Sequence, residues 1–275
     1  MPDPQTPMFE TPAAPRGLAQ AARVFAWTAA TFAFAFAFAA PAAADWLELE
    51  ARYWAPTLGG GGSATFEGVQ VDLDLERDLG LDVDESLEGR LTIRPGAGFF
   101  LRGRFQNLSS AGTGTADLDV VLGTVDLGLR VATDGVLDFE YANLALGWQY
   151  ESPQGKVRIG PFAEAKGVRG DASIRLSALG QSVQFADEFE GAFGAVGGLV
   201  EIQPTSRFQV FAEVSVLVEG DDADLTEAEA GLRFFATETL GLGVGYRSLQ
   251  IDGTIDDIPL DLEFEGGFAS LVLRF

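Results

Sequence analysis

The sequence has no cysteine and no histidine in its 275 residues. Without cysteine there are no disulfide bonds and no thiol nucleophiles, and without either residue there is no zinc site of the common Cys and His type. The lack of imidazole also excludes every catalytic triad or dyad that relies on histidine. These two absences remove the commonest metal centres and hydrolytic sites.

Basic side chains are scarce, because 18 Lys and Arg residues stand against 41 Asp and Glu residues, for a formal net charge of -23. Only two of the basic residues, Lys156 and Lys166, are lysines. No basic stripe is available to bind phosphates, which argues against a nucleic-acid partner. A soluble acidic protein usually keeps more lysine on its surface, so the composition is unusual for a soluble protein.

Long apolar runs are absent after residue 44, and the one before it covers residues 24–40. Arg16 and Arg23 precede this run, and three alanines at 42–44 follow it. A positive segment, an apolar segment and small residues at the end are typical of a secretory signal peptide. We therefore predict that residues 1–44 are a cleaved signal peptide. A retained membrane anchor of about the minimum spanning length is the alternative.

Residues 45–275 alternate apolar and polar side chains with a period of two, which indicates β-strands. Nine segments show the alternation clearly: 47–53, 90–94, 99–106, 142–150, 157–164, 208–216, 229–234, 240–247 and 270–275. A tenth, 188–202, is rich in glycine and its facing is ambiguous. The expected fold is all-β, an antiparallel transmembrane up-and-down β-barrel of about 10 strands, with 8–12 possible.

The connections between these strands are of two kinds. Tight turns are expected at 95–98, 152–155, 204–207 and 237–240, and longer loops at 58–86, 109–137, 170–187, 220–224 and 252–260. Short turns at one end and longer loops at the other are typical of an outer-membrane barrel. Strand-like patches at 69–75 and 118–131 could lengthen strands above the membrane or raise the strand count to twelve.

The alternation fits either a soluble barrel with apolar residues inside or a membrane barrel with apolar residues outside. Aromatic residues cluster beside the tight turns, as in an interfacial girdle: Trp46, Phe99, Trp148, Tyr150, Phe208, Phe234 and Phe275. The polar face is rich in Gly and Arg and poor in Lys, which suits a packed lumen better than a solvated surface. Both features favour the membrane barrel.

The last eight residues, FASLVLRF, place Leu271, Leu273 and Phe275 on one face and finish on Phe. This ending resembles the C-terminal signal of Gram-negative outer-membrane β-barrels. The resemblance implies assembly by the barrel-insertion machinery and a location in the cell outer membrane, surrounded by lipid and lipopolysaccharide. RYWAP (52–56) with DLGL (78–81) is similar to a poorly characterised group of proteobacterial barrel proteins, and this second resemblance implies no activity.

The polar face carries charges of both signs, which would point into a narrow lumen. The expected lumen network contains Glu48, Glu50, Arg52, Arg90, Arg94, Arg102, Arg104, Arg158, Glu164, Glu213, Glu229, Arg233 and Arg247, with Lys166 and Arg274 on the same face. An unpaired buried charge costs several kcal/mol, so Arg102 and Arg104 should be held by carboxylates such as Glu48, Glu50 or Glu213. The network is either a plug of ion pairs or a charged constriction that selects solutes. The small bore of ten strands favours the plug.

The first long loop is strongly acidic, with Glu67, Asp72, Asp74, Glu76, Asp78, Asp82, Asp84, Glu85 and Glu88. Clustered carboxylates attract hard cations such as Ca²⁺, so divalent cations are possible partners at the acidic loops. The spacing of residues 72, 74, 76 and 78 would place four carboxylates on one side of an extended segment. The pattern D-x-D-x-D-G of calcium loops is absent, which favours a hydrated surface.

No catalytic or cofactor-binding residue is expected. The known barrel enzymes of outer membranes, which are proteases of the omptin type, phospholipases and lipid A acyl-chain enzymes, resemble one another in relying on histidine. We therefore expect an integral outer-membrane barrel with a structural or surface-facing role, a charge-filled lumen and no catalysis. A narrow passive porin-like channel is the alternative, and a soluble lipid-carrying barrel is a third interpretation.

Overall fold

The computed structural model describes residues 46–66, 69–83, 86–122, 125–178, 181–218, 223–255 and 258–275. The predicted signal peptide, 1–44, lies outside the described residues. None of the described residues belongs to a helix long and apolar enough to cross a membrane. Every regular element in the described part of the chain is a β-strand.

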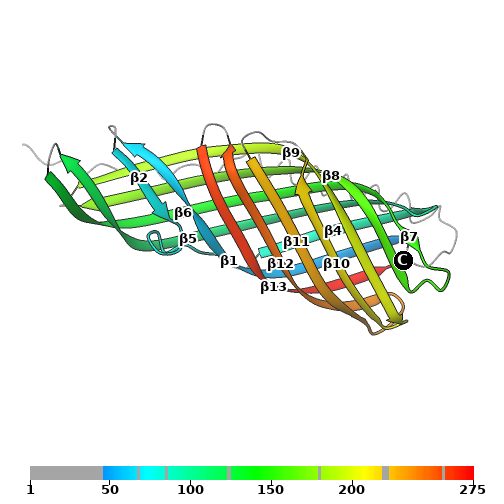
Figure 1. Cartoon of the computed structure of the whole chain (residues 1–275). Helices are drawn as coiled ribbons and strands as arrows, with labels where there is room; N and C mark the ends of the chain where they lie inside the picture. Colours follow the sequence, from blue (N-terminus) through cyan, green and yellow to red (C-terminus); the bar gives the residue numbers. More distant parts are fainter. Residues whose placement is uncertain are drawn as a thin grey trace, which may run out of the picture. The chain divides into compact units, whose positions relative to one another are not determined.

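The strands form one antiparallel sheet that closes on itself, as Figure 1 shows. They are β1 (Leu47–Phe66), β2 (Val69–Asp74), β3 (Asp82–Val83), β4 (Ser86–Gly96), β5 (Phe99–Leu122), β6 (Val125–Trp148), β7 (Tyr150–Glu151), β8 (Val157–Ala178), β9 (Gln181–Thr205), β10 (Phe208–Leu217), β11 (Ala223–Phe235), β12 (Leu240–Ile255) and β13 (Ile258–Arg274). The sheet order runs from β13 down to β4, then β1, and β1 pairs with β13 to close the ring.

Ten wall positions account for these thirteen strands. β2, β3 and β4 share the position between β1 and β5, because β2 pairs with β1, β3 pairs with β5 and β4 pairs with both. The two-residue β7 continues β6 after Gln149 and pairs with β8. The described residues therefore form a closed barrel of ten antiparallel strands, which confirms the predicted fold class.

The tight turns lie where the sequence predicts them, and glycine residues allow the backbone conformation of the turn between β4 and β5. Between β4 and β5, Gly96, Ala97 and Gly98 all have positive φ, a region that glycine adopts without strain. The chain ends at the same end of the barrel as these turns, where the backbone N–H of Phe275 donates to the carbonyl of Leu47 at 2.9 Å.

Four predicted loops, 58–86, 109–137, 170–187 and 252–260, are mostly strand among their described residues, which corrects the sequence-based prediction. β1 runs to Phe66 and pairs there with β2. β5 pairs with β6 out to Leu122 and Val125, β8 pairs with β9 out to Ala178 and Gln181, and β12 pairs with β13 out to Ile255 and Ile258. Along each of these strands the apolar residues lie on the outward face near the tight turns and on the inward face further away. The apolar–polar alternation of the sequence therefore changes phase at this point, although the strand continues. The patches at 69–75 and 118–131 form β2 and the distal ends of β5 and β6.

The change of face divides the barrel into two parts. We call the part beside the tight turns the turn-end half, represented by 240–247 on β12 and 267–275 on β13, and the remainder the distal half. In the turn-end half the outward residues are apolar, as Leu242, Val244 and Leu271 illustrate. In the distal half the outward residues include exposed Gln250 and half-buried Glu263. The apolar band spans seven residues of β12 and nine of β13, which is about 18–23 Å for strands tilted by ~40°.

Candidate functional site: the filled lumen

All thirteen residues of the predicted lumen network occupy inward-facing positions of the turn-end half. Ten are buried: Glu48, Glu50, Arg52, Arg90, Arg102, Arg104, Glu164, Glu229, Arg233 and Arg247. Arg94, Arg158 and Glu213 keep about a tenth of their side chains exposed. Lys166 and Arg274 are buried among them. Strands from the whole circumference contribute, so the network crosses the lumen.

Glu229 of β11 lies at the centre of the network. Its Oε2 is 2.6 Å from Arg52 Nη1, 2.7 Å from Arg90 Nη2 and 3.5 Å from Arg104 Nη2. These arginines belong to β1, β4 and β5, and the Glu229 side chain has no exposed surface. One carboxylate therefore ties three neighbouring wall positions to the strand on the opposite side of the barrel.

Glu213 of β10 holds both arginines of β5. Arg102 Nη1 lies 2.5 Å from Glu213 Oε2, and Arg104 Nη2 lies 2.8 Å from Glu213 Oε1. The sequence also allows Glu48 and Glu50 as partners of Arg102 and Arg104. In the structure Glu48 and Glu50 bind other arginines, and Glu213 alone of the three reaches the β5 pair.

Glu48 and Glu50 of β1 bind arginines of the neighbouring strands β4 and β13 and of the more distant β11. Arg233 Nη2 lies 2.6 Å from Glu50 Oε2, and Arg274 Nε lies 3.0 Å from Glu48 Oε2. Arg94 is held more loosely, because its nitrogens lie 3.4 Å from both Glu48 and Glu201.

The only lysine of the lumen among the described residues lies between two carboxylates. Lys166 Nζ is 2.6 Å from Glu227 Oε2 and 2.9 Å from Glu164 Oε1, and it donates to Ser215 Oγ at 2.8 Å. The hydroxyl of Tyr141 donates to Glu227 Oε2 at 2.7 Å. The hydroxyl groups of Ser215 and Tyr141 thus add hydrogen bonds to the Lys166 ammonium and to the Glu227 carboxylate, beside their ion pairs.

Aromatic rings inside the barrel pack against the guanidinium groups. The guanidinium carbons lie over ring centroids at 3.8 Å for Arg274 and Phe235, 4.3 Å for Arg233 and Phe211, 4.4 Å for Arg52 and Phe268, and 4.7 Å for Arg247 and Trp54. Cation–π contacts of this kind contribute about 0.5–2 kcal/mol each. They also fill the space that ion pairs alone would leave between the strands.

Three carboxylates of the network were not predicted to lie there. Glu88 was placed in the acidic loop but is buried in the lumen, where its Oε2 lies 2.5 Å from Arg247 Nη1. Glu88 lies two residues before the inward-facing Arg90, and residues two apart on a strand face the same side, so this spacing indicates that Glu88 faces the lumen. Glu227 likewise lies two residues before the inward-facing Glu229. Glu201 lies in the glycine-rich segment whose facing was ambiguous.

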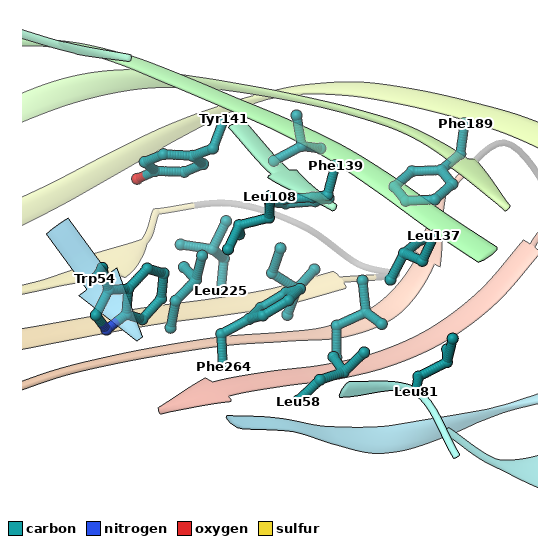
Figure 2. Packing of buried hydrophobic residues seen from close by; sticks show 14 of the residues in the cluster. Trp54, Leu58, Leu81, Leu108, Leu137, Phe139, Tyr141, Phe189, Leu225 and Phe264 are labelled. Carbon is teal, nitrogen blue, oxygen red and sulfur yellow. The ribbon is translucent and has the colours of Figure 1, made fainter. Parts of the chain in front are cut away.

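Above the charged layers the interior is apolar, as Figure 2 shows. The side chains that meet there include Trp54, Leu58, Leu81, Leu108, Leu137, Phe139, Tyr141, Phe189, Leu225 and Phe264. Phe139 and Phe264 stack with centroids 5.3 Å apart. Burial of such side chains stabilises by roughly 1.5–3 kcal/mol each. The distal half is thus packed like the core of a water-soluble barrel.

Residues 75–81, between β2 and β3, fold into this apolar interior. Leu79 and Leu81 are buried in it, and Gly80 has a φ of 61°. The inner wall accommodates the segment closely, because a Cβ on Gly112 would lie 2.0 Å from the Gly80 carbonyl oxygen and one on Gly114 2.4 Å from that of Asp78. The inserted segment contains the DLGL residues and lies inside the distal half of the barrel.

This insertion corrects the prediction for the acidic segment. Asp74, Glu76 and Asp78 do not line one side of an extended strand, because the chain turns there and Asp78 Oδ2 accepts a hydrogen bond from the N–H of Asp74 at 3.0 Å. Glu67, Asp84, Glu85 and the side chain of Asp72 lie outside the described residues. Within the described part of the chain, no group of three or more acidic residues has an arrangement that could hold a metal ion.

No protein-family model matches the sequence, and no curated protein matches it in sequence. Among solved structures the chain is similar to the outer membrane protease OmpT from Escherichia coli, with a TM-score of 0.58, 9% identity, and coverage of 86% of this chain and 99% of that one. It is also similar to the transport unit of the autotransporter AIDA-I from Escherichia coli, at a TM-score of 0.41, 9% identity and coverage of 86% and 91%. Neisserial surface protein A is similar at a TM-score of 0.31, 12% identity and coverage of 85% and 99%.

The class of the protein follows from its own surface together with this fold. A closed barrel with an apolar outer band and a charged lumen is a transmembrane barrel, and barrels of this architecture belong to bacterial outer membranes. The protein is an integral outer-membrane β-barrel with buried charged residues inside. The likeness to OmpT, at 9% identity, concerns the fold alone.

Proposed function

We propose that the protein is a closed barrel with a structural or surface-facing role and no catalytic activity. The observation that carries this proposal is the double filling of the lumen: paired charges occupy the turn-end half and an apolar core occupies the distal half. The absence of histidine from the whole sequence supports the lack of catalysis. The pairing of Glu213, Glu227 and Glu229 also supports the lack of catalysis, because each of these carboxylates lies within ion-pair distance of at least three cations and is thereby engaged.

Conductance in a planar lipid bilayer tests the closed lumen. The unmutated protein, inserted from detergent, should give no unitary current above the background of the bare membrane. A general porin inserted under the same conditions is the positive control. Reproducible unitary steps from the unmutated protein would favour the narrow passive channel instead, because paired charges that fill a lumen leave no path for ions.

For the surface-facing role, we propose lipopolysaccharide as the neighbour of the distal half, with divalent cations between the two. Outward carboxylates lie in register on three adjacent strands there, since Asp138 pairs with Asp171 and Asp171 pairs with Glu188. No three of the described carboxylates are arranged to hold a metal ion by themselves, so in this proposal each cation is shared with lipid phosphates, which supply the remaining oxygen ligands. Calcium should therefore increase the lipopolysaccharide retained by the purified protein, and the triple change to Asn, Asn and Gln should abolish that increase.

We also propose that the barrel-insertion machinery recognises the outward face formed by Leu271, Leu273 and Phe275. Phe275 is half exposed at the turn end. Deletion of Phe275 should prevent accumulation in the outer membrane while export to the periplasm continues, as fractionation would show. Phe234→Ala is the matched control, because Phe234 is an exposed aromatic residue at the same end but inside the chain. Equal loss in both variants would contradict a role specific to the chain end.

A further inference from the structure

The charged layers contain more cations than carboxylates. Among the described residues, ten basic side chains face the lumen of the turn-end half: Arg52, Arg90, Arg94, Arg102, Arg104, Arg158, Lys166, Arg233, Arg247 and Arg274. Eight buried or mostly buried carboxylates face them: Glu48, Glu50, Glu88, Glu164, Glu201, Glu213, Glu227 and Glu229. A ninth, the half-exposed Glu151, lies 3.5 Å from Arg158. The formal excess is one positive charge in a protein whose net charge is -23. Uncompensated charge in a confined interior is costly, so the excess calls for a negative occupant.

A small cavity lies where the excess is found. Four arginines line it, Arg90, Arg94, Arg102 and Arg233, against three carboxylates. The space open to the centre of a water-sized occupant is about 20 Å³, which is room for one occupant of atomic size. Phe100 and Leu199 form an apolar part of its wall.

Arg102 brings unused hydrogen-bond donors to this cavity. Its side chain is buried, and its Nη1 binds Glu213, but its Nε and Nη2 have no hydrogen-bond partner among the described residues. The Nε of Arg94 is also without one there, and the contacts of Arg94 at 3.4 Å are longer than the 2.7–2.9 Å of strong charge-assisted bonds. Buried donors of a charged group are unfavourable unless a partner is bound.

The carboxylates that line the cavity do not supply this partner. Glu213 lies within ion-pair distance of three arginines, and Glu48 lies within that distance of three others. Their negative charge is already divided among several cations. Glu201 lies 3.4 Å from Arg94 and 3.6 Å from Arg158, and its Oε2 accepts no hydrogen bond among the described residues. The wall of the cavity therefore carries this one unused acceptor beside the unused N–H donors of Arg102 and Arg94.

We propose that this cavity binds a small monovalent anion of the chloride type, held chiefly by Arg102 and Arg94. The anion accepts the unused guanidinium N–H bonds and reduces the excess positive charge of the lumen. Larger anions such as gluconate are excluded by the size of the cavity. The site goes beyond the proposed closed role of the barrel and does not depend on it.

The test compares thermal unfolding of the folded protein in sodium chloride and in sodium gluconate at equal ionic strength, which holds charge screening constant. Chloride should raise the Tm in a saturable way, by about 2–4 °C at a concentration about five times its dissociation constant. Arg102→Gln should lose this increment. Arg247→Gln, which removes an equal charge from a buried lumen arginine whose partners do not line the cavity, should keep it. Equal Tm values in both salts, or an increment retained by Arg102→Gln, would overturn the proposal.

If Arg102→Gln does not fold, crystals of the unmutated protein grown in bromide decide the question. An anomalous peak in the cavity beside Arg102 supports the anion site. A cavity that holds water only, without anomalous signal, overturns it.

Discussion

On β13 the inward-facing side chains change from Arg274 and Ser270 near the chain end to Phe264 in the distal half. The outward-facing ones change in the opposite sense, from Leu271 to Glu263. β12 shows the same exchange, with Arg247 inside the turn-end half and Leu249 two positions further on in the distal half. The two halves share continuous strands and differ in which chemistry the strands bury.

The medium outside the wall accounts for the difference. Lipid surrounds the turn-end half, so its apolar residues face outward and its polar residues face inward, where they must satisfy one another. A polar, hydrated medium outside the distal half has the opposite effect, because there the hydrophobic effect drives apolar residues into the interior. The turn-end half therefore depends on ion pairing, whereas the distal half depends on close packing.

The largest effect is expected from Glu229→Gln, which removes the carboxylate shared by Arg52, Arg90 and Arg104. Loss of a partner to buried charges costs about 3–5 kcal/mol, and here three cations lose the same partner. The midpoint of urea unfolding in lipid vesicles should fall accordingly. Glu238→Gln, on the exposed turn before β12, is the control and should change the free energy of unfolding little. Equal midpoints for the two variants would mean that water, not pairing, stabilises the lumen charges.

Leu249→Ala tests the packing of the distal half. Leu249 has no exposed surface, and truncation of a buried leucine costs about 2–5 kcal/mol. The neighbouring Gln250 is exposed, so Gln250→Ala should cost far less in the same urea titration. If Gln250→Ala is the more damaging of the two, the inside and outside of the distal half have been assigned the wrong way round.

A smaller effect is expected where residues 75–81 contact the wall. Gly112→Ala would place a Cβ 2.0 Å from the backbone carbonyl of Gly80, and overpacking of this kind costs about 1–3 kcal/mol. Gly89→Ala is the matched control, because no atom lies within 4 Å of the added Cβ. Added protease should also cleave near residue 80 faster in Gly112→Ala than in Gly89→Ala. Identical stability and cleavage would show that the segment does not pack against β5.

The smallest effect concerns Asp78 in the inserted segment, outside the membrane band. The hydrogen bonds from the Arg77 guanidinium lower the pKa of Asp78 below its ordinary value, and the N–H of Asp74 adds to this. A carboxyl whose folded pKa is lowered stabilises the fold above its unfolded pKa and loses that contribution as the pH falls through the folded pKa.

Asp78→Asn should therefore lower the free energy of unfolding at pH 7 by less than about 1 kcal/mol, since Arg77 is exposed. The difference from the unmutated protein should vanish near pH 2, as urea titrations at both pH values would show. Asp82→Asn, at an exposed position nearby, controls for the loss of one charge. A difference that persists at pH 2 would exclude the ionised carboxylate as its source.

The sequence predicts much of the turn-end half because its alternation keeps one phase. Leu240, Leu242, Val244 and Tyr246 all face outward, so the strand, the facing and the inward position of Arg247 follow together. Nine of the ten strands, and the inward facing of the thirteen charged residues, were predictable for this reason; the facing of the glycine-rich tenth segment, 188–202, was not.

The distal half was not predictable by the same rule, because the phase of the alternation reverses within single strands. The next two apolar residues of β12 after Tyr246 are Leu249 and Ile251, which are odd-numbered and face inward. Because the regular spacing of apolar residues is interrupted there, a sequence pattern based on apolar positions predicts that the strand ends at the reversal. For the ion pairs, Glu213 is one of several candidate partners of Arg102 in the sequence, which cannot choose among them because the choice depends on which strands lie across the lumen from each other.

The change in the medium outside one strand can be measured directly. Because the chain has no cysteine, a single introduced cysteine carries a spin label at one chosen outward position. Val244→Cys and Gln250→Cys place the label on the same face of β12, six residues apart, in protein reconstituted into lipid bilayers. The label at 244 should collide mainly with oxygen, which dissolves in lipid, and the label at 250 mainly with a water-soluble nickel complex. High oxygen and low nickel accessibility at both positions would place the distal half in the membrane and contradict the division of the barrel into two halves.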